Sequence, residues 1–186
     1  MSQVYRINLT GDAKLLYYEE RMLCSNAAEF NIPFTVIRDE SGEYINYLCD
    51  GYVPFDRYNF NMLGNVFTVL QTTIRYYMKA KKYLLNPFRF FSDTERILIS
   101  SSSGAAIPLF GKELNNTGFE ENELNLLVPI INELSMLRDV MCAKDAMEKI
   151  YKKVRDSNPG LKDILKIVLA EEREWSIILP ASFAKS

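Results

Sequence analysis

The side chains that most often perform catalysis at neutral pH are scarce in this chain. Its 186 residues include no histidine, which excludes Ser-His-Asp and Cys-His machinery and removes the commonest nitrogen ligand for metals. The three cysteines, Cys24, Cys49 and Cys142, are far apart and form no Cys-x-x-Cys pair. This spacing favours small buried thiols in a reducing cytoplasm over a metal or redox site.

The acidic residues offer carboxylates, but not in pairs suited to acid–base catalysis. They occur as neighbours at Glu19-Glu20, Glu120-Glu121 and Glu171-Glu172. Neighbouring side chains on a helix point about 100° apart, so the two members of a pair do not face one substrate. We therefore interpret the three pairs as solvated faces or helix-end charges.

A serine run, Ser100 to Ser103 followed by Gly104, could present backbone N–H groups to a phosphate. A phosphate-binding loop of the P-loop class ends in Gly-Lys-Ser/Thr and opens a helix. That ending is missing here, and the chain continues into the strand-like residues 105–109. The sequence therefore predicts the tip of a hairpin at this position.

The composition indicates an ordinary globular protein, and we expect one domain over residues 1–186. The net charge of −2 provides no basic field that would favour nucleic acid or an anionic membrane. No run approaches the roughly 18 apolar residues that span a bilayer, and residues 1–10 lack the apolar core of a signal peptide. We expect a cytoplasmic protein without a membrane span, a nucleic-acid partner, a metal or another cofactor.

The first 55 residues predict a small β-rich lobe. Residues 3–9 alternate between apolar and polar side chains, as a half-buried strand does. Residues 13–30 fit either a helix or a second strand over 14–18 that leads into a short helix, and we adopt the second interpretation. Residues 32–37 and 44–49 predict an antiparallel hairpin, because they are rich in β-branched and aromatic side chains. Together these segments predict an antiparallel sheet of three to four strands.

Residues 56–186 predict a mainly helical lobe that contains a hairpin over 95–110. A helix over 59–82 has apolar residues at helical spacing, and its last turns carry basic residues that complement the helix dipole. These basic residues alternate with tyrosines and could also touch nucleic acid, but the rest of the chain supplies no basic groove. The fold class is therefore α+β.

The C-terminal third predicts further helices. One apolar stripe extends from Leu124 to Met141, a second from Ala143 to Val154, and a third from Leu161 to Leu169. The polar segment 111–123 predicts an exposed loop. The tail from Leu179 to Ser186 contains a proline and is expected to be irregular.

The order of sheet, long helix, loop, hairpin and helices resembles a reduced protein-kinase-like arrangement. It is similar to an uncharacterised domain of Gram-positive, clostridial-type bacteria that often stands N-terminal to a forkhead-associated domain. It also resembles the pseudokinase-like cytosolic domain of the type VII secretion component EssB. The resemblance covers most of the chain and rests on Met22-Leu23, Asn26, Pro33-Phe34, Tyr47, Gly51, the long helix, Tyr83 to Pro87, Ile97 to Ile99, and Ile107 to Leu109.

The kinase comparison assigns specific positions to the catalytic motifs. If the proline of the kinase catalytic loop, His-Arg-Asp-Leu-x-Pro-x-Asn, is placed on Pro87, the general-base Asp falls on Leu84 and the magnesium-binding Asn on Arg89. The Asp-Phe-Gly motif corresponds to Leu109-Phe110-Gly111. Leucine neither accepts a proton nor binds magnesium, and phosphoryl transfer depends on both. The resemblance thus implies no kinase activity, with Leu84 and Leu109 closing the place of the metal. If the alignment does not hold, Leu84, Leu85 and Leu109 are expected to be core residues.

Two hypotheses of function follow, and neither assigns a catalytic, cofactor-binding or metal-binding residue. The first is a non-catalytic, pseudokinase-like scaffold or adaptor module near a membrane signalling or secretion assembly. The second is a small regulatory or phage-type protein that binds another protein, with its abundant Tyr and Phe on an exposed patch. A third possibility, an enzyme that uses Asp, Glu and Tyr, lacks the spacing of paired carboxylates. The sequence names neither the protein partner nor the oligomeric state.

Overall fold

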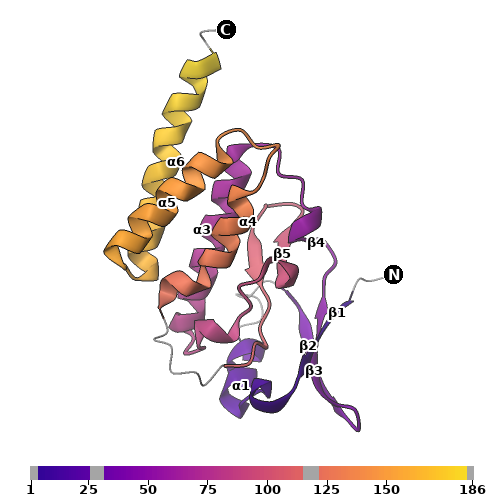
Figure 1. The fold of residues 1–186 in the computed structure, drawn as a ribbon. Coiled ribbons are helices and arrows are strands. Elements are labelled where there is room, and N and C mark those ends of the chain that lie inside the picture. Colours follow the sequence, from indigo (N-terminus) through magenta and orange to yellow (C-terminus); the bar gives the residue numbers. More distant parts are fainter. Residues whose placement is uncertain (1–3, 26–31, 115–121, 184–186) are drawn as a thin grey trace.

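The computed structural model describes residues 4–25, 32–114 and 122–183. It confirms the α+β class: small antiparallel sheets lie in the N-terminal part, within residues 4–108, and helices occur both between the strands and after them (Figure 1). Among the described residues, none of the helices combines the length and the apolar character needed to cross a membrane. One continuous core joins the sheets to the helices, and it extends from Ile7 in the first strand to Val168 in the last helix.

The first sheet contains the predicted hairpin. Its strands are β1 (Val4–Leu9), β2 (Phe34–Asp39) and β3 (Gly42–Leu48), in the order β1-β3-β2 with both pairings antiparallel. Ile45 lies opposite Ile7 on one side and Val36 on the other. The turn between β2 and β3 uses Gly42 at a φ of +133°, a conformation that only glycine adopts readily. The alternation of side chains therefore sets the register of the three strands.

The predicted strand over residues 14–18 is wrong. A 3₁₀ turn, η1 (Gly11–Ala13), leads through extended residues into helix α1 (Tyr17–Ser25). The Glu19 carboxylate accepts a hydrogen bond from the Leu16 N–H at 3.0 Å, which is one half of a capping box. This cap stabilises the helix start and overrides the strand preference of the two tyrosines.

The second sheet contains one strand that local patterns do not reveal. Its order is β4 (Tyr52–Pro54), β5 (Ile97–Ser100) and β6 (Ala106–Pro108), and both pairings are antiparallel. Strands β5 and β6 form the predicted hairpin. Strand β4 lies outside the segments predicted to be strands, and its Val53 pairs with Ile99. Three residues carry too little periodicity to predict a strand, and the partner lies more than 40 residues away.

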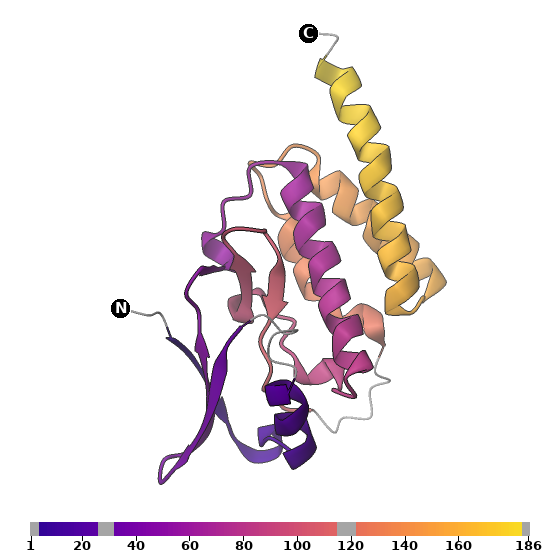
Figure 2. The same cartoon turned by 180° about the vertical axis from the view of Figure 1, so that it is seen from behind.

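Helix α3 (Leu63–Lys82) lies at the centre of the molecule, between the second sheet and α6 (Figure 2). A 3₁₀ turn, η2 (Phe55–Arg57), precedes it, and the turns η3 (Pro87–Arg89) and η4 (Thr94–Arg96) follow before β5. The Thr72 hydroxyl accepts the Ala106 N–H at 2.9 Å and so ties the helix to β6. This helix confirms the strongest sequence prediction, because its buried residues recur at the helical period: Val66, Phe67, Leu70, Ile74 and Tyr77.

The C-terminal elements are η5 (Glu123–Leu126), α4 (Val128–Ser135), α5 (Ala143–Ser157) and α6 (Leu161–Phe183). The stripe predicted to reach Met141 ends earlier, because α4 stops at Ser135 and Met141 is exposed. The irregular tail predicted from Leu179 is also wrong in part, since α6 continues to Phe183. Pro180 lacks one backbone donor but does not end the helix. Most of the predicted loop 111–123 lies outside the described residues.

Candidate functional site

Leu84 is placed differently from what the kinase comparison implies. Its side chain is 75% exposed, and its φ is +57°, so it neither closes a metal position nor belongs to the core. The Leu85 N–H donates to the Ala80 carbonyl at 2.9 Å, and the Leu84 N–H donates to that of Lys81 at 3.1 Å. These two bonds form a Schellman motif, which ends α3 with a left-handed residue. The turn directs Leu84 outward and Leu85 into the core.

Leu109, in contrast, is buried as expected. Its carbonyl accepts the Phe91 N–H at 2.8 Å, and its N–H donates to the Arg96 carbonyl at 3.0 Å. Phe110 follows and packs edge-on against Phe90, with 4.9 Å between the ring centroids. This segment is therefore part of the packed interior.

Arg89 is the most heavily bonded side chain in this region. Its guanidinium is 3% exposed and forms an ion pair with Glu19, whose side chain is 2% exposed. Both N···O distances, Nε to Oε1 and Nη2 to Oε2, are 3.2 Å. The guanidinium also donates to three carbonyls, those of Ala13 and Lys14 at 3.0 Å and that of Lys112 at 3.1 Å. Arg89 therefore fastens the N-terminal segment to the body of the protein.

Two of the acidic residues predicted to be solvated are buried. Glu19 is on the buried side of α1 and contacts Arg89. Glu171 on α6 is covered by the side chains of Lys149 and Lys153 on α5. The capping position of Glu19 is visible in the sequence, but its partner is 70 residues away. Glu120 and Glu121 lie outside the described residues.

The space between the first sheet and the body is filled by side chains. A small apolar cavity of about 10 Å³ remains there, at the lower limit for one water molecule. Ligand pockets have several hundred Å³, so a nucleotide does not fit this cavity. Its lining residues come from both sides of the space: Leu23, Ile32, Phe34, Tyr47, Tyr76, Phe90, Ile107, Leu109 and Phe110.

Tyr47 and Gly111 explain how closely the sheet approaches the body. The Tyr47 hydroxyl donates to the Phe110 carbonyl and accepts the Phe110 N–H, both at 3.1 Å. Burial raises the pKa of this phenol well above its ordinary value, so it stays protonated. A Cβ on Gly111 would lie 2.8 Å from Ile7 Cγ2, which leaves room for glycine only. The N-terminal sheet thus packs over Phe110.

The carboxyls with shifted pKa values do not form an acid–base pair. The pKa of Asp39 is lowered by the Ser41 hydroxyl, that of Asp163 by the Lys166 ammonium, and that of Glu174 by the Lys149 ammonium. Asp39 lies on β2, whereas Asp163 and Glu174 lie on α6 but are 11 residues apart, and each carboxylate is stabilised in its charged form. Within the described parts of the chain, no three Cys, Asp or Glu side chains gather as a metal site would require.

An open groove lies beside α1. Its volume is about 500 Å³, and its lining includes Leu15, Tyr17, Glu20, Arg21, Cys24 and Arg38. Arg38 Nη2 contacts a Glu20 carboxylate oxygen at 2.6 Å and a Glu43 oxygen at 2.9 Å, so the charges of Arg38 and Glu20 at the rim are paired. Burial raises the pKa of the Cys24 thiol, which disfavours its reactive thiolate.

Three consecutive apolar residues next to the groove are exposed. They are Leu16, Tyr17 and Tyr18, and we name them the α1 face; Tyr17 is 75% exposed. Their exposure contrasts with Glu19, the next residue, which is buried. Sequence patterns missed this surface, because it depends on which side of α1 faces the body.

Comparison with known proteins adds no relative to this description. The chain matches no protein-family model, no curated protein and no solved structure. The candidate site is therefore defined by its own geometry: an exposed apolar surface and groove, anchored from behind by a buried ion pair.

Proposed function

We propose that this chain is a non-catalytic protein-interaction module that acts as a scaffold or adaptor through the α1 face and its groove. The observation that carries this proposal is the exposure of Leu16, Tyr17 and Tyr18 beside an open groove. Tyrosine is enriched at the centres of protein interfaces, where its ring supplies apolar area and its hydroxyl a hydrogen bond. The paired charges of Arg38 with Glu20 and Glu43 supply a polar rim.

The anchoring of α1 supports a binding role. Glu19 is the next residue after the α1 face, and its ion pair with Arg89 restrains the helix from the buried side. A partner that binds a restrained surface loses less conformational entropy than one that must order a loose segment. The groove is therefore suited to recognition without a prior folding step.

The pseudokinase character of the module remains part of the proposal. At the positions aligned with the catalytic Asp, the magnesium-binding Asn and the Asp of Asp-Phe-Gly, this chain has Leu84, Arg89 and Leu109. None of these side chains binds magnesium, and the guanidinium of Arg89 is already committed to Glu19. The resemblance to pseudokinase-like domains leads us to propose a cytoplasmic role near a membrane signalling or secretion assembly.

Titration calorimetry with ATP and magnesium, combined with a phosphotransfer assay, tests the non-catalytic part. We expect no transfer of phosphate to protein or peptide substrates. Tight nucleotide binding accompanied by phosphotransfer would overturn the proposal.

Affinity capture from the native host tests the binding surface. The wild-type chain is compared with the double variant Tyr17→Ala/Tyr18→Ala and with Leu48→Ala, a control that removes an exposed apolar residue outside the α1 face. We expect a protein that the wild type and the control retain and the double variant loses. If all three chains retain the same proteins, the α1 face is not the binding surface.

The alternative is a small regulatory or phage-type protein with no kinase relationship. The exposed Tyr17 and Tyr18 favour it, since it predicts aromatic residues on an exposed patch. It also predicts an N-terminal sheet that does not cover the Leu84–Phe110 region. This second prediction holds for the exposed Leu84 but not for Phe110, which bonds to Tyr47. Both functions use protein binding, and the identity of the captured protein distinguishes them.

A further inference from the structure

Strand β2 lies at one edge of the first sheet. Among the described strands, β3 is its only neighbour in the order β1-β3-β2. The Leu48 N–H donates to the Pro33 carbonyl at 2.8 Å, which shows where the bonds between β2 and β3 lie. In an antiparallel pair, such hydrogen-bonded positions alternate with positions whose backbone groups point away from the partner strand. The register therefore directs the N–H and C=O groups of Phe34, Val36 and Arg38 outward.

These outward backbone groups are open. In the parts of the chain that the structure describes, Phe34, Val36 and Arg38 form no backbone hydrogen bond on this side. Their side chains are partly exposed or exposed, whereas Ile45 on the central strand is fully buried. A strand edge with unused donors and acceptors is a template for pairing with another extended chain. Each of the three residues offers one donor and one acceptor to a further strand.

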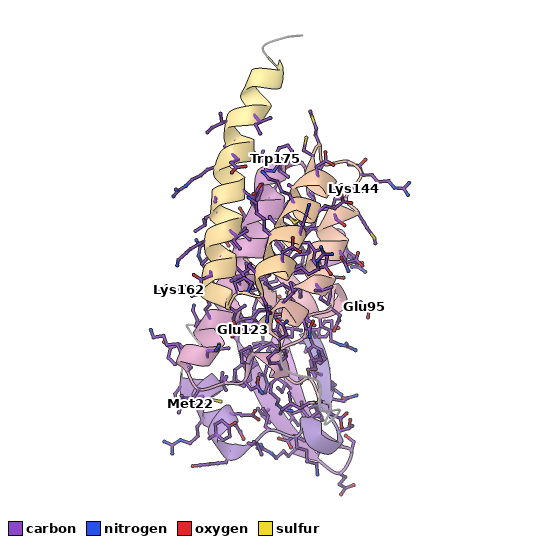
Figure 3. The ribbon with its side chains drawn as sticks, turned by 60° about the vertical axis from the view of Figure 1, so that its left-hand side comes forward. Met22, Glu95, Glu123, Lys144, Lys162 and Trp175 are labelled. Atoms are coloured by element: carbon purple, nitrogen blue, oxygen red, sulfur yellow. The ribbon has the colours of Figure 1, made fainter. Side chains whose placement is uncertain are left out.

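The open edge adjoins the groove beside α1. Arg38 is the last outward residue of β2 and lines this groove together with residues of α1, and its guanidinium pairs with Glu20. The other edge strand, β1, contributes no described residue to the groove lining. Figure 3 places Met22 of α1 at the end of the molecule opposite Trp175 of α6, so α5 and α6 lie away from this site. A strand added to β2 would therefore run directly beside the groove.

The charges of the groove favour an acidic occupant. Its lining includes two guanidinium groups, those of Arg21 and Arg38, and one carboxylate, that of Glu20. Arg38 is paired with Glu20, whereas Arg21 forms no ion pair within the described residues. The Arg21 guanidinium lies 5.8 Å from the centroid of the Tyr17 ring, at the groove. A guanidinium in this position can bind a carboxylate through two parallel hydrogen bonds.

We propose that the groove binds an extended, acidic segment of the protein partner, which adds to β2 as a fourth strand of the first sheet and places a carboxylate against Arg21. Backbone bonds to the open edge supply affinity, and the groove receives alternate side chains of the segment and supplies specificity. Its volume of about 500 Å³ is sufficient for several side chains. This inference deepens the proposed function and rests on it, because it names the partner of the same groove.

A second copy of this chain is a poor occupant of the edge. Its own β2 contains one carboxylate, Asp39, which already accepts the Ser41 N–H and the Tyr44 hydroxyl, both at 2.8 Å. Its β1 contains no acidic residue and carries Arg6. Either strand would bring a further guanidinium to the site, because β2 carries Arg38. The charge of Arg21 would then stay without a partner, so a segment of another protein fits better.

Hydrogen exchange of the free protein, followed by NMR, tests the open edge. The amides of Phe34, Val36 and Arg38 point outward and are expected to exchange fast. Those of Thr35 and Ile37 donate to β3 and are expected to exchange at least about tenfold more slowly. Equal protection along the whole of β2 overturns the proposal, because the outward groups would then have partners already.

A phage-displayed library of random peptides of about ten residues is the probe for binding. We expect the selected peptides to be rich in Asp and Glu, and a synthetic peptide to slow the exchange of the outward β2 amides. Val36→Pro removes one outward donor and should weaken the binding of this peptide at least about tenfold. Val36→Ala, which keeps that donor, and Asn8→Pro, which removes an outward donor of β1, are the controls. Both are expected to bind close to the wild-type affinity.

The exposed Arg21 provides a second variant that does not depend on proline. Arg21→Glu is expected to reverse the selection from acidic to basic peptides, and circular dichroism verifies that each variant folds. The proposal is overturned if the library yields no peptide, if the selected peptides lack acidic residues, or if Val36→Pro and Val36→Ala bind alike. A wild-type dimer that Val36→Pro disrupts also overturns it, since a second copy would then be the occupant.

The two proposals fail separately. Peptides that bind Val36→Pro as they bind the wild type, but that the double variant Tyr17→Ala/Tyr18→Ala loses, would reject strand addition and keep the α1 face as a binding surface. Peptides that all these variants bind alike would reject both proposals. Slower exchange of the outward β2 amides in the presence of the synthetic peptide, together with the loss in Val36→Pro, is the result expected of strand addition.

Discussion

The two ends of this molecule expose apolar residues in opposite ways. At the α1 end, Tyr17 and its neighbours lie on a short helix that is held from behind by the buried Glu19–Arg89 ion pair. At the other end, Ile177 and Ile178 lie on the projecting part of α6. An exposed side chain can therefore belong to a fixed surface or to an arm. Fixed surfaces favour recognition with little reorganisation, whereas an arm favours exchange with a complementary site.

The ion pairs that hold α1 and α6 in place also differ, in how far their charged side chains are exposed to water. Arg89 and Glu19 are both buried, so neither charge can reach water if the other is removed. Glu171 on α6 is also buried, but its partners Lys149 and Lys153 are 42% and 44% exposed. The two lysines that pair with Glu171 can therefore reach solvent. The predictions below measure this difference.

The largest effect is expected for Arg89→Ala. This change leaves the Glu19 carboxylate buried without its counter-charge and three carbonyls without their donor, and it should cost about 3–5 kcal/mol of unfolding free energy. Urea denaturation measures the loss. The exposed pair of Arg155 and Asp156 provides the control, since Arg155→Ala should cost at most about 1 kcal/mol. Equal losses for the two variants would show that burial does not set the strength of the anchor.

A smaller effect is expected for Glu171→Ala on α6. The two lysines that lose their partner can turn into water, so the loss should be about 1–2 kcal/mol. Urea denaturation and hydrogen exchange of the α6 amides measure it. A loss as large as that of Arg89→Ala would contradict the contrast between the two anchors.

Leu84→Gly is expected to stabilise the protein by about 0.5–1 kcal/mol, because glycine adopts the left-handed conformation without a steric penalty. The side chain that is removed is exposed and contributes little to packing. Leu84→Ala is the matched control, since alanine keeps the strained conformation and gains nothing. A stabilisation of both variants alike would instead indicate that exposure of the leucine, and not its φ of +57°, carries the cost.

The smallest effect concerns pH and the α6 end. The Lys149 ammonium lowers the pKa of Glu174 below its ordinary value of 4.5, so ionised Glu174 stabilises the folded state. This contribution is present above pH 4.5 and is lost as the pH falls through the lowered pKa. The difference in unfolding midpoint between the wild type and Glu174→Gln should therefore shrink in acid. A difference that stays constant from pH 7 to pH 3 would exclude the ion pair as its cause.

Local patterns predicted much of the fold where one residue period dominates. The alternation along residues 44–48 produced the central strand of the first sheet, and the spacing from Leu63 to Met78 produced α3. The short helix predicted after residue 18 is present as α1, but the strand predicted before it is not, because a single side chain, Glu19, caps the helix and sets its start at Tyr17. The prediction also failed for Leu84, which lacks the glycine that normally signals a left-handed helix end.

The candidate site was the least predictable part. The α1 face consists of apolar residues that a sequence pattern places in a core, and only the packing of Glu19 and Leu23 against the body turns Leu16 to Tyr18 outward. Surfaces of this kind depend on tertiary contacts, and these produce no periodic pattern of apolar residues in the local sequence.

By itself, the sequence determined the α+β class, the hairpins and the long central helix, because each depends on interactions within a few residues along the chain. It also determined that no histidine is available for chemistry. The tertiary structure alone decided that Arg89 reaches Glu19, that the space beside Phe110 is filled, and that apolar residues are exposed at the two ends. These outcomes depend on which distant segments pack together. Burial then determines whether a charged or apolar side chain stabilises the fold or is exposed and available to a binding partner.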